Sequence, residues 1–203
     1  MTETHVSKNA AVIDINDLHV IWYDLEKTIS TMDFAARLLK EGCSPWTLVT
    51  AEQQLQGRGT HGRGWISLYG KGLLLSLILP PPSDPSCMED LSVKTAGSLV
   101  ESLNEFYDLP FEIKRPNDVV IHGRKVAGIL FESITRGKDV VSVILGMGIN
   151  LHQSAEDFKH AGLPDATSLF IEAGYAPLKK HLLVSFLKQF KLLYETLILK
   201  ITE

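Results

Sequence analysis

The pattern of hydrophobic and polar residues in the first eighty positions predicts strands separated by polar segments. Strands are expected at 19–24, 46–51 and 72–79, where β-branched, aromatic and leucine residues are concentrated. The third of these runs, GLLLSLIL, is apolar almost throughout and is typical of a buried strand. Residues 1–18 are mixed in character and are interpreted as a polar leader.

Two helices are expected in the first half of the chain. Ser30 with Asp33 predicts the start of one helix by a capping box, and Gly42 predicts its end. Ser86 with Glu89 predicts the start of the other. Apolar residues then recur at helical spacing in each (Phe34, Ala35, Leu38 and Leu39; Leu91, Ala96, Leu99, Leu103 and Phe106). Both helices should therefore turn an apolar face to the core.

The second half of the chain predicts strands followed by helices. A tight turn is expected at Gly123, and a mobile polar loop at 152–166. A short helix at 167–173 and a long one at 178–201 follow. The strands are expected at 111–114, 119–122, 125–133 and 140–150, with TRGKD as the last turn. This order favours an α+β fold with one mixed, mostly antiparallel sheet flanked by helices.

Composition narrows the class of protein. The chain has 203 residues with 45% hydrophobic content, which suits one domain, expected over 19–203. Its net charge of −4 argues against wholesale binding to nucleic acid or to an anionic membrane surface. Cys43 and Cys87 lie far apart without a CxxC motif, and no apolar run is long enough to cross a bilayer. A cytoplasmic protein is expected.

Charge is distributed unevenly, and the segment GRGTHGRGW (57–65) is the most informative stretch. No acidic residue occurs from Gln53 to Ser83, whereas Arg58, Arg63 and Lys71 are basic. Glycines let the backbone approach a ligand, and arginine forks bind phosphate or carboxylate oxygens. The segment therefore suits a small anion beside the flat face of Trp65. A plain hairpin tip and an RNA-binding loop remain open alternatives.

Three further stretches carry polar groups at strand ends. In KRPNDV (114–119), Asp118 can hold a metal ion or a basic residue, although Pro-Asn-Asp is also ordinary turn chemistry. In GRKVAGIL (123–130), Lys125 is expected to share a face with Ala127 and Ile129, or else to protect an edge strand. In GMGIN (146–150), glycines admit a ligand or form a bulge. The common zinc and nucleotide motifs, HExxH, GxxxxGK[ST] and GxGxxG after a strand, do not occur.

These stretches in this order resemble the catalytic domain of biotin protein ligases. The resemblance rests on AEQQLQGRGTHGRGW, KRPNDV, GRKVAGILFE, GMGIN and ATSL (166–169), and it covers the chain from about His19 to the final helix. It implies the class II aminoacyl-tRNA synthetase-like fold of biotin and lipoate ligases. It also implies that the loops at 57–65 and 152–166 fold over a reactive intermediate and exclude water.

The resemblance further implies a reaction. The family activates the carboxylate of biotin with ATP and Mg²⁺ to give biotinyl-5′-AMP. It then passes the biotin to a lysine in the biotin carboxyl carrier domain of a biotin-dependent carboxylase. Biotin is thus the expected substrate, ATP and Mg²⁺ form the expected co-substrate, and neither nucleic acid nor a membrane is an expected partner. A homodimer is left open.

Roles for individual residues follow from the same resemblance. Lys125, Arg58 and Asp118 are the expected catalytic residues, and Mg²⁺ is expected with ATP, near Asp118, without a firm protein ligand set. The expected biotin contacts are Ser30, Thr31, Met32, Gln54, Arg58, Gly59, Thr60, Lys125 and Gly128. The expected nucleotide contacts are Arg58, Arg63, Trp65, Lys114, Asn117, Lys125 and Asn150.

The sequence departs from the family pattern at three positions. Thr60 stands where the family usually has arginine, Arg115 where it usually has tryptophan, and Met32 where it often has asparagine. A small C-terminal β domain and an N-terminal DNA-binding domain, both common in the family, are not expected, and neither is a repressor role. The alternatives are a ligase for lipoate or another carboxylate, and a non-catalytic biotin-binding homologue.

Overall fold

The computed structural model describes residues 10–15, 18–82 and 88–199. The chain forms two compact units, of which unit 1 comprises Met1–Pro81 with Leu130–Ile149, and unit 2 comprises Pro82–Ile129 with Asn150–Glu203. Each unit combines strands with helices. The predicted α+β fold, a mixed and mostly antiparallel sheet flanked by helices, is confirmed.

Unit 1 is built on strands in the spatial order β1, β2, β3, β6, β10 and the second half of β9. β2 pairs with β3 in parallel, whereas the β1–β2 and β3–β6 pairs are antiparallel. β6 is buried along its whole length, as its apolar run predicts. The strands are β1 (Ala10–Ile15), β2 (Leu18–Thr28), β3 (Thr47–Gln54), β6 (Gly72–Leu79), β9 (Arg124–Arg136) and β10 (Asp139–Asn150).

The interpretation of residues 1–18 as a polar leader is wrong for the segment Ala10–Ile15. This segment is strand β1, and it pairs with β2 from Ala10 opposite Tyr23 to Ile15 opposite Leu18. From residue 11 to 15 only Ile15 is buried, and the sequence AAVIDI does not alternate between apolar and polar residues, so no strand pattern marked this segment. The strand forms because β2 supplies a hydrogen-bonding edge.

Helix α1 (Thr31–Lys40) begins and ends where the sequence predicts. The Ser30 hydroxyl accepts a hydrogen bond from the Met32 amide at 3.2 Å, and Gly42 has a φ of 89°, a left-handed conformation that suits glycine. Asp33 does not complete the predicted capping box, because its carboxylate pairs with Arg58. The cap therefore relies on the serine.

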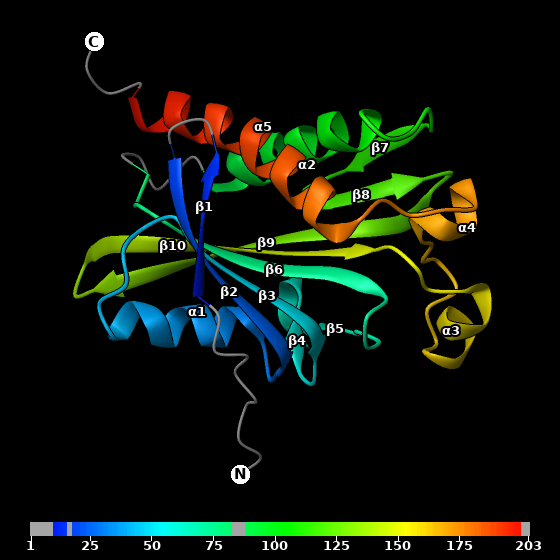
Figure 1. Ribbon diagram of the computed structural model, residues 1–203, viewed down its shortest axis with the longest axis horizontal. Helices are drawn as coiled ribbons and strands as arrows, with labels where there is room; N and C mark the ends of the chain where they lie inside the picture. The colour runs from blue at the N-terminus through cyan, green and yellow to red at the C-terminus, as the bar shows by residue number, and fades with distance from the viewer. Residues whose placement is uncertain (1–9, 16–17, 83–87, 200–203) are drawn as a thin grey trace. The chain divides into compact units, whose positions relative to one another are not determined.

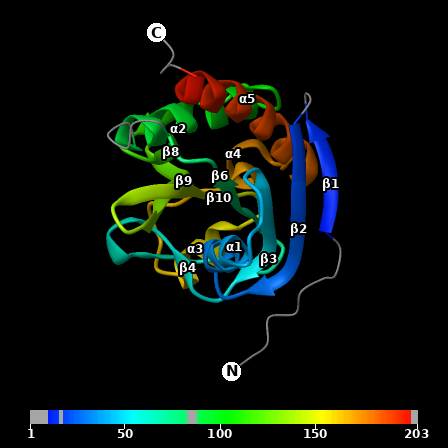
Figure 2. The ribbon, with the colours of Figure 1, turned by 90° about the vertical axis from the view of Figure 1, so that its left-hand side faces the viewer.

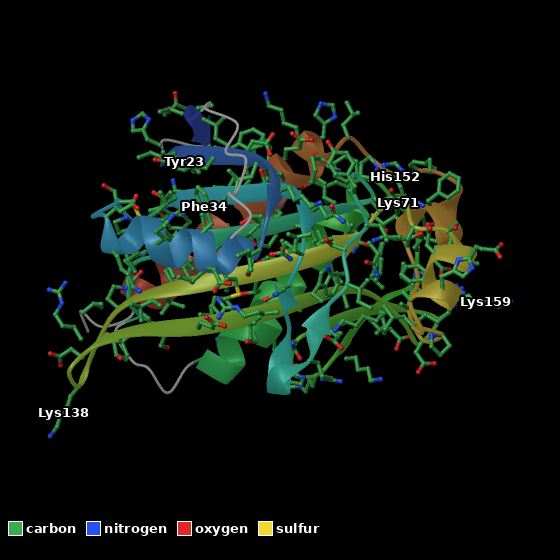
Figure 3. All side chains as sticks on the ribbon, turned by 90° about the horizontal axis from the view of Figure 1, so that it is seen from below. Tyr23, Phe34, Lys71, Lys138, His152 and Lys159 are labelled. Atoms are coloured by element: carbon green, nitrogen blue, oxygen red, sulfur yellow. The ribbon has the colours of Figure 1, made fainter. Side chains whose placement is uncertain are left out.

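The apolar face of α1 packs on the sheet of unit 1. Phe34 and Leu38 are buried in a cluster with strand residues such as Val49 and Ile78. The rings of Tyr23 and Phe34 lie 6.1 Å apart between centroids. Both side chains are labelled in Figure 3. Figures 1 and 2 show α1 lying along β3, and in Figure 2 the helix is seen nearly end-on. This packing fixes the start of α1 beside the ends of β2 and β3.

Unit 2 contains β7 (Phe111–Lys114), β8 (Asp118–Ile121) and the first half of β9, which pair antiparallel in that order. The β8–β9 turn is His122–Gly123, and both residues have positive φ, as a two-residue hairpin turn requires. The second half of β9 leads into β10 through Gly137 and Lys138, a shorter turn than TRGKD. Lys138 points outward at the tip of this hairpin (Figure 3).

Helices α2 (Met88–Asn104) and α5 (Lys179–Leu199) pack against each other in unit 2 (Figure 1). Four of the predicted apolar residues of α2 are buried, whereas Phe106 lies beyond the helix end. On α5, the rings of Phe186, Phe190 and Tyr194 follow one another at 5.4 Å between centroids. Both helices are core elements as predicted. The predicted cap at Ser86 lies outside the described residues.

The prediction of a mobile loop at 152–166 is wrong in part. This stretch contains helix α3 (Ala155–His160), whose start is fixed by a capping box between Ser154 and Asp157. Phe158 anchors the helix and is buried. A helix this short shows no periodicity, so only the cap could have indicated it. The predicted short helix that follows is confirmed as α4 (Leu169–Ala173), which is capped by Ser168.

Burial affects two titratable side chains outside the predicted site. It raises the pKa of the Cys43 thiol and, with a smaller contribution from Tyr175, that of the Tyr107 hydroxyl. The Tyr107 and Tyr175 rings stack at 4.9 Å between centroids, and the Tyr107 hydroxyl donates to the Tyr175 carbonyl. The contacts between Tyr107 and Tyr175 therefore stabilise the fold of unit 2. Along the described segments, no helix combines the length and hydropathy needed to cross a membrane.

The cap of α3 can be tested by removing its hydroxyl. We expect Ser154→Ala to cost about 1 kcal/mol of local stability, because it removes the acceptor for the Asp157 amide. Hydrogen exchange measured by mass spectrometry should then become faster across 155–163 and stay unchanged elsewhere. Ser133→Ala, at an exposed position of β9, is the control. Equal protection in both variants would contradict the capping assignment.

Candidate functional site

The segment 57–65 forms a small hairpin, which we call the Gly-Arg hairpin. Strand β4 (Gly57–Arg58) pairs with β5 (Gly64–Trp65), and a 3-10 turn, η1 (Thr60–Gly62), joins them. The Gly59 amide donates to the Arg63 carbonyl at 2.8 Å. A Cβ atom on Gly57 would lie 2.5 Å from the Trp65 carbonyl oxygen, so this strand pair needs glycine. The hairpin alternative is thus correct for the backbone.

The glycines of GMGIN make room for two side chains of the predicted site. A Cβ atom on Gly148 would lie 2.4 Å from the Trp65 ring, and one on Gly146 would lie 2.5 Å from the Met32 sulfur. In this structure the two glycines admit side chains of the protein, Trp65 and Met32, where the sequence suggested a ligand or a bulge. The packing of Trp65 on Gly148 holds the base of the Gly-Arg hairpin against β10.

A polar cluster forms at the start of α1. Gln54 Oε1 accepts hydrogen bonds from the Thr31 amide at 2.8 Å and from the Thr31 hydroxyl at 3.0 Å. The Ser76 hydroxyl donates to Thr31 Oγ1 at 2.8 Å. Unit 1 thus brings together Thr31 and Gln54, next to Ser30. Sequence reasoning missed Ser76, although it is the one polar residue in the apolar run GLLLSLIL.

Arg58 is held by two carboxylates. Its Nη2 atom lies 3.1 Å from Asp33 Oδ1 on α1 and 3.1 Å from Glu132 Oε2 on β9. Sequence reasoning did not assign either acidic residue to the site. No local pattern indicates these contacts, because both partners are distant from Arg58 in sequence.

Arg63 is held within the hairpin itself. Its Nη2 donates to the Thr60 hydroxyl at 3.2 Å, and its Nε donates to the Thr60 carbonyl at 3.4 Å. Thr60 therefore orients a neighbouring cation at the position where the family usually has arginine. Both arginines of the hairpin have defined partners.

Lys125 pairs with Asp118 in unit 2. The Lys125 Nζ atom lies 2.7 Å from Asp118 Oδ1, and this oxygen is buried. The angles do not satisfy hydrogen-bond geometry, so the contact is an ion pair defined by distance. The basic partner that the sequence suggested for Asp118 is thus Lys125, and Asp118 supplies the partner that a lysine at this position requires.

The prediction that Lys125 shares a face with Ala127 and Ile129 is wrong. Asp118 lies opposite Gly128 and Val120 lies opposite Lys125, with a bulge that leaves Val126 as the extra residue. Directly opposed residues share a face, and so do residues two apart on one strand. Lys125 and Gly128 therefore lie on the face of Asp118, whereas Ala127 lies on the other. The bulge turns the lysine toward its carboxylate.

Two asparagines brace the strand that carries Lys125. The buried Asn117 side chain donates to the Ile129 carbonyl at 2.7 Å, and the Ile129 amide donates to the Asn117 carbonyl at 2.9 Å. Asn150 Nδ2 donates to the Thr167 carbonyl at 2.9 Å and, more weakly, to the Lys125 carbonyl at 3.5 Å. Both amide groups therefore bind backbone in this structure.

The ATSL stretch completes the bracing of Lys125. The Lys125 amide donates to the Asp165 carbonyl, and the Thr167 amide donates to the Lys125 carbonyl, each at 2.8 Å. Gln153, which sequence reasoning missed, donates from Nε2 to Asn150 Oδ1 at 3.0 Å. Lys125 is thus held through its own backbone on both sides. This explains why ATSL and GMGIN accompany the lysine stretch.

The predicted residues divide between the two units. Unit 1 holds Ser30, Thr31, Met32, Gln54, Arg58, Gly59, Thr60, Arg63 and Trp65, and unit 2 holds Lys114, Asn117, Asp118, Lys125, Gly128 and Asn150. Lys114 is exposed at the end of β7 and takes part in none of the contacts described above. Within the described residues, no three side chains of histidine, cysteine, aspartate or glutamate come together as metal ligands.

The fold is similar to that of solved biotin protein ligases. A biotin protein ligase from Aquifex aeolicus, solved with biotin and ATP, superposes with a TM-score of 0.72 and 31% sequence identity. That match covers 87% of this chain and 71% of the Aquifex chain.

Comparison of the sequence with known families and proteins identifies the family. Residues 25–150 match the model of the biotin/lipoate A/B protein ligase family, and the chain belongs to this family. The bifunctional ligase/repressor BirA of Bacillus subtilis is 36% identical over 177 residues, which cover 85% of this chain and 54% of BirA. A biotin--[acetyl-CoA-carboxylase] ligase of Paracoccus denitrificans is 36% identical over 155 residues, which cover 75% of this chain and 59% of that protein. The chain therefore spans little more than half the length of these curated relatives.

The contact between Trp65 and Gly148 can be tested by adding one methyl group. We expect Gly148→Ala to reduce the free energy of unfolding by roughly 1–3 kcal/mol, because its Cβ would overlap the indole. Gly97→Ala in helix α2 is the matched control, since its Cβ meets no atom within 4 Å and alanine favours helix by about 1 kcal/mol. Urea denaturation measures both. A gain in stability in both variants would show that Trp65 does not fill this space.

Proposed function

We propose that the chain is the catalytic part of an ATP-dependent biotin protein ligase. It would form biotinyl-5′-AMP from biotin and Mg-ATP and transfer the biotin to a lysine of a biotin carboxyl carrier domain. Family membership and the names of the relatives support this proposal. The structural observation that carries it is the Lys125–Asp118 pair, in which a cation is held at 2.7 Å on a braced strand.

In the first step, a carboxylate oxygen of biotin attacks the α-phosphorus of ATP, and pyrophosphate leaves. Two anions must come together, so positive charge has to be in place where the new bond forms. We assign this role to Lys125 and Arg58, each of which is held by carboxylates within its own unit. Mg²⁺ enters as part of the nucleotide substrate and neutralises the departing pyrophosphate.

In the second step, the amine of the acceptor lysine attacks the carbonyl carbon of the mixed anhydride. An amide bond forms, AMP leaves, and the amine loses a proton. We assign Asp118 to this step as the carboxylate that accepts the proton, in addition to its pairing with Lys125. The partner is thus a carrier domain of a biotin-dependent carboxylase.

The remaining assignments follow the chemistry of the two substrates. Polar groups at the start of α1 suit the ureido ring of biotin, and the hairpin backbone suits its rings and acyl chain (Ser30, Thr31, Met32, Gln54, Gly59, Thr60, Gly128). Exposed cations and a flat indole suit the nucleotide (Arg63, Trp65, Lys114). Asn117 and Asn150 would support that side by bracing the Lys125 strand. Because ATP is the co-substrate, we place the reaction in the cytoplasm, and a homodimer remains to be measured.

Lys125 provides the most direct test of the mechanism. We expect Lys125→Ala to lower biotin-dependent pyrophosphate exchange at least about 100-fold, because it removes a preorganised charge. Lys125→Arg should also be strongly impaired, since a planar fork cannot replace a compact ammonium at 2.7 Å from Asp118.

Lys138→Ala, at the tip of the β9–β10 hairpin, is the control and should leave exchange unchanged (Figure 3). Circular dichroism and urea denaturation verify that each variant is folded. Near-normal exchange by folded Lys125→Ala protein would remove Lys125 from the mechanism.

The substrate can be identified by comparing three carboxylates. We expect pyrophosphate exchange with biotin and little exchange with lipoate or octanoate, because the polar cluster suits a ureido group that both acids lack. Transfer is measured separately, as a mass increase on a carrier-domain fragment incubated with biotin and Mg-ATP. Preference for lipoate or octanoate would assign another ligase activity. Biotin binding by calorimetry without AMP formation would indicate a non-catalytic homologue.

A further inference from the structure

We propose that Asp33 and Glu132 position Arg58 for the adenylation step, as a pair of carboxylates that we call the carboxylate tether. The inference rests on the proposed function, because it concerns the same reaction. It assigns a role to two acidic side chains to which neither the sequence analysis nor the mechanism above gives a part in the reaction. Both act through Arg58, and are therefore positioning residues.

The geometry of the tether leaves most of the guanidinium group available. Both carboxylate contacts are made by Nη2, at 3.1 Å each. Across the described residues, the side chain of Arg58 makes no other polar contact, which leaves three N–H groups on Nη1 and Nε for an anion. A guanidinium fixed at one nitrogen and open at the others is arranged to present a fork to phosphate or carboxylate oxygens.

The two carboxylates come from elements that are themselves fixed. Asp33 lies in the first turn of α1, whose apolar face is buried against the sheet. Glu132 lies on β9, which is hydrogen-bonded within the sheet. Arg58, by contrast, lies between Gly57 and Gly59 in a two-residue strand. The tether thus connects the short Gly-Arg hairpin to a helix and a strand that are packed or paired within unit 1.

Positioning is a stronger explanation for the tether than stability. The contacts are partly exposed, with side-chain exposures of 37%, 52% and 32% for Arg58, Asp33 and Glu132, and exposed ion pairs add little to stability. An unrestrained arginine loses side-chain entropy when it is ordered. If the tether orders Arg58 before substrate binds, that entropy is already lost on folding. The charge is then in place when the two anions meet.

The charges of the tether allow positioning to be distinguished from simple electrostatics. Two carboxylates beside one guanidinium leave the cluster with one excess negative charge, which opposes the binding of anions. If charge alone mattered, neutralising one carboxylate would lower KM for ATP without lowering kcat. If the tether positions Arg58, the same change lowers kcat, while KM for ATP stays the same or falls.

The first experiment measures the tether without any substrate. Trypsin must draw the Arg58 side chain into its own pocket to cut the bond between residues 58 and 59, so a tethered Arg58 is protected. In the ligand-free protein, Asp33→Asn and Glu132→Gln should raise cleavage at this bond severalfold relative to cleavage after Arg63. Arg63 lies in the same hairpin and bonds to Thr60 instead, so it serves as an internal reference.

Asp139→Asn and Glu112→Gln are matched controls, because both residues are exposed and neither contacts the hairpin arginines. The controls should leave the cleavage ratio unchanged. An unchanged ratio in both tether variants would overturn the tether.

The second experiment measures the role of the tether in the reaction. Each tether variant should lower kcat of biotin-dependent pyrophosphate exchange on the order of tenfold, since small misplacements of a reacting group are costly. Asp33→Glu, which keeps the charge, should restore part of the loss. Unchanged kcat in both Asp33→Asn and Glu132→Gln would overturn the positioning role. If the unmodified protein shows no exchange, the proposed function fails, and the proteolysis result alone decides whether the tether exists.

Discussion

The proposed mechanism depends on cations that are held by carboxylates before any substrate is present. In unit 1, Arg58 is held by Asp33 and Glu132, and in unit 2, Lys125 is held by Asp118. A reaction that joins a carboxylate to a phosphate needs positive charge with a fixed position, because moving charges into place during the reaction costs free energy. An isolated cation on a flexible loop would not meet this requirement, and a partner carboxylate supplies the restraint.

Irregular features of the backbone create these pairs. The bulge at Val126 turns Lys125 onto the face of Asp118, and a regular strand would have turned it away. The strand around the bulge is then braced by Asn117, Asn150 and the Thr167 amide. In the hairpin, Gly57 permits the close strand pair that places Arg58. Local exceptions to regular structure therefore produce the ion pairs on which the proposed mechanism rests.

Sequence patterns predicted the elements with strong local signals and missed those that depend on distant partners. The apolar run of β6 and the serine cap of α1 were confirmed because each is determined by neighbouring residues. Strand β1 was missed because it forms on an edge supplied by β2. Motifs also identified most candidate site residues, but the bulge and the carboxylates on Arg58 had no local signature. Register shifts and ion pairs between distant residues depend on tertiary structure.

Thr60 shows how a departure from the family pattern is accommodated in this chain. An arginine at this position would be the third in the same short hairpin, after Arg58 and Arg63. Thr60 instead accepts hydrogen bonds from Arg63 through its hydroxyl and its carbonyl. The hairpin thus carries fewer cations, and each of the two that we assign to substrate is restrained. The free energy gained from a charge depends on its position as well as its sign. A restrained Arg63 therefore compensates for part of the charge that an arginine at position 60 would supply.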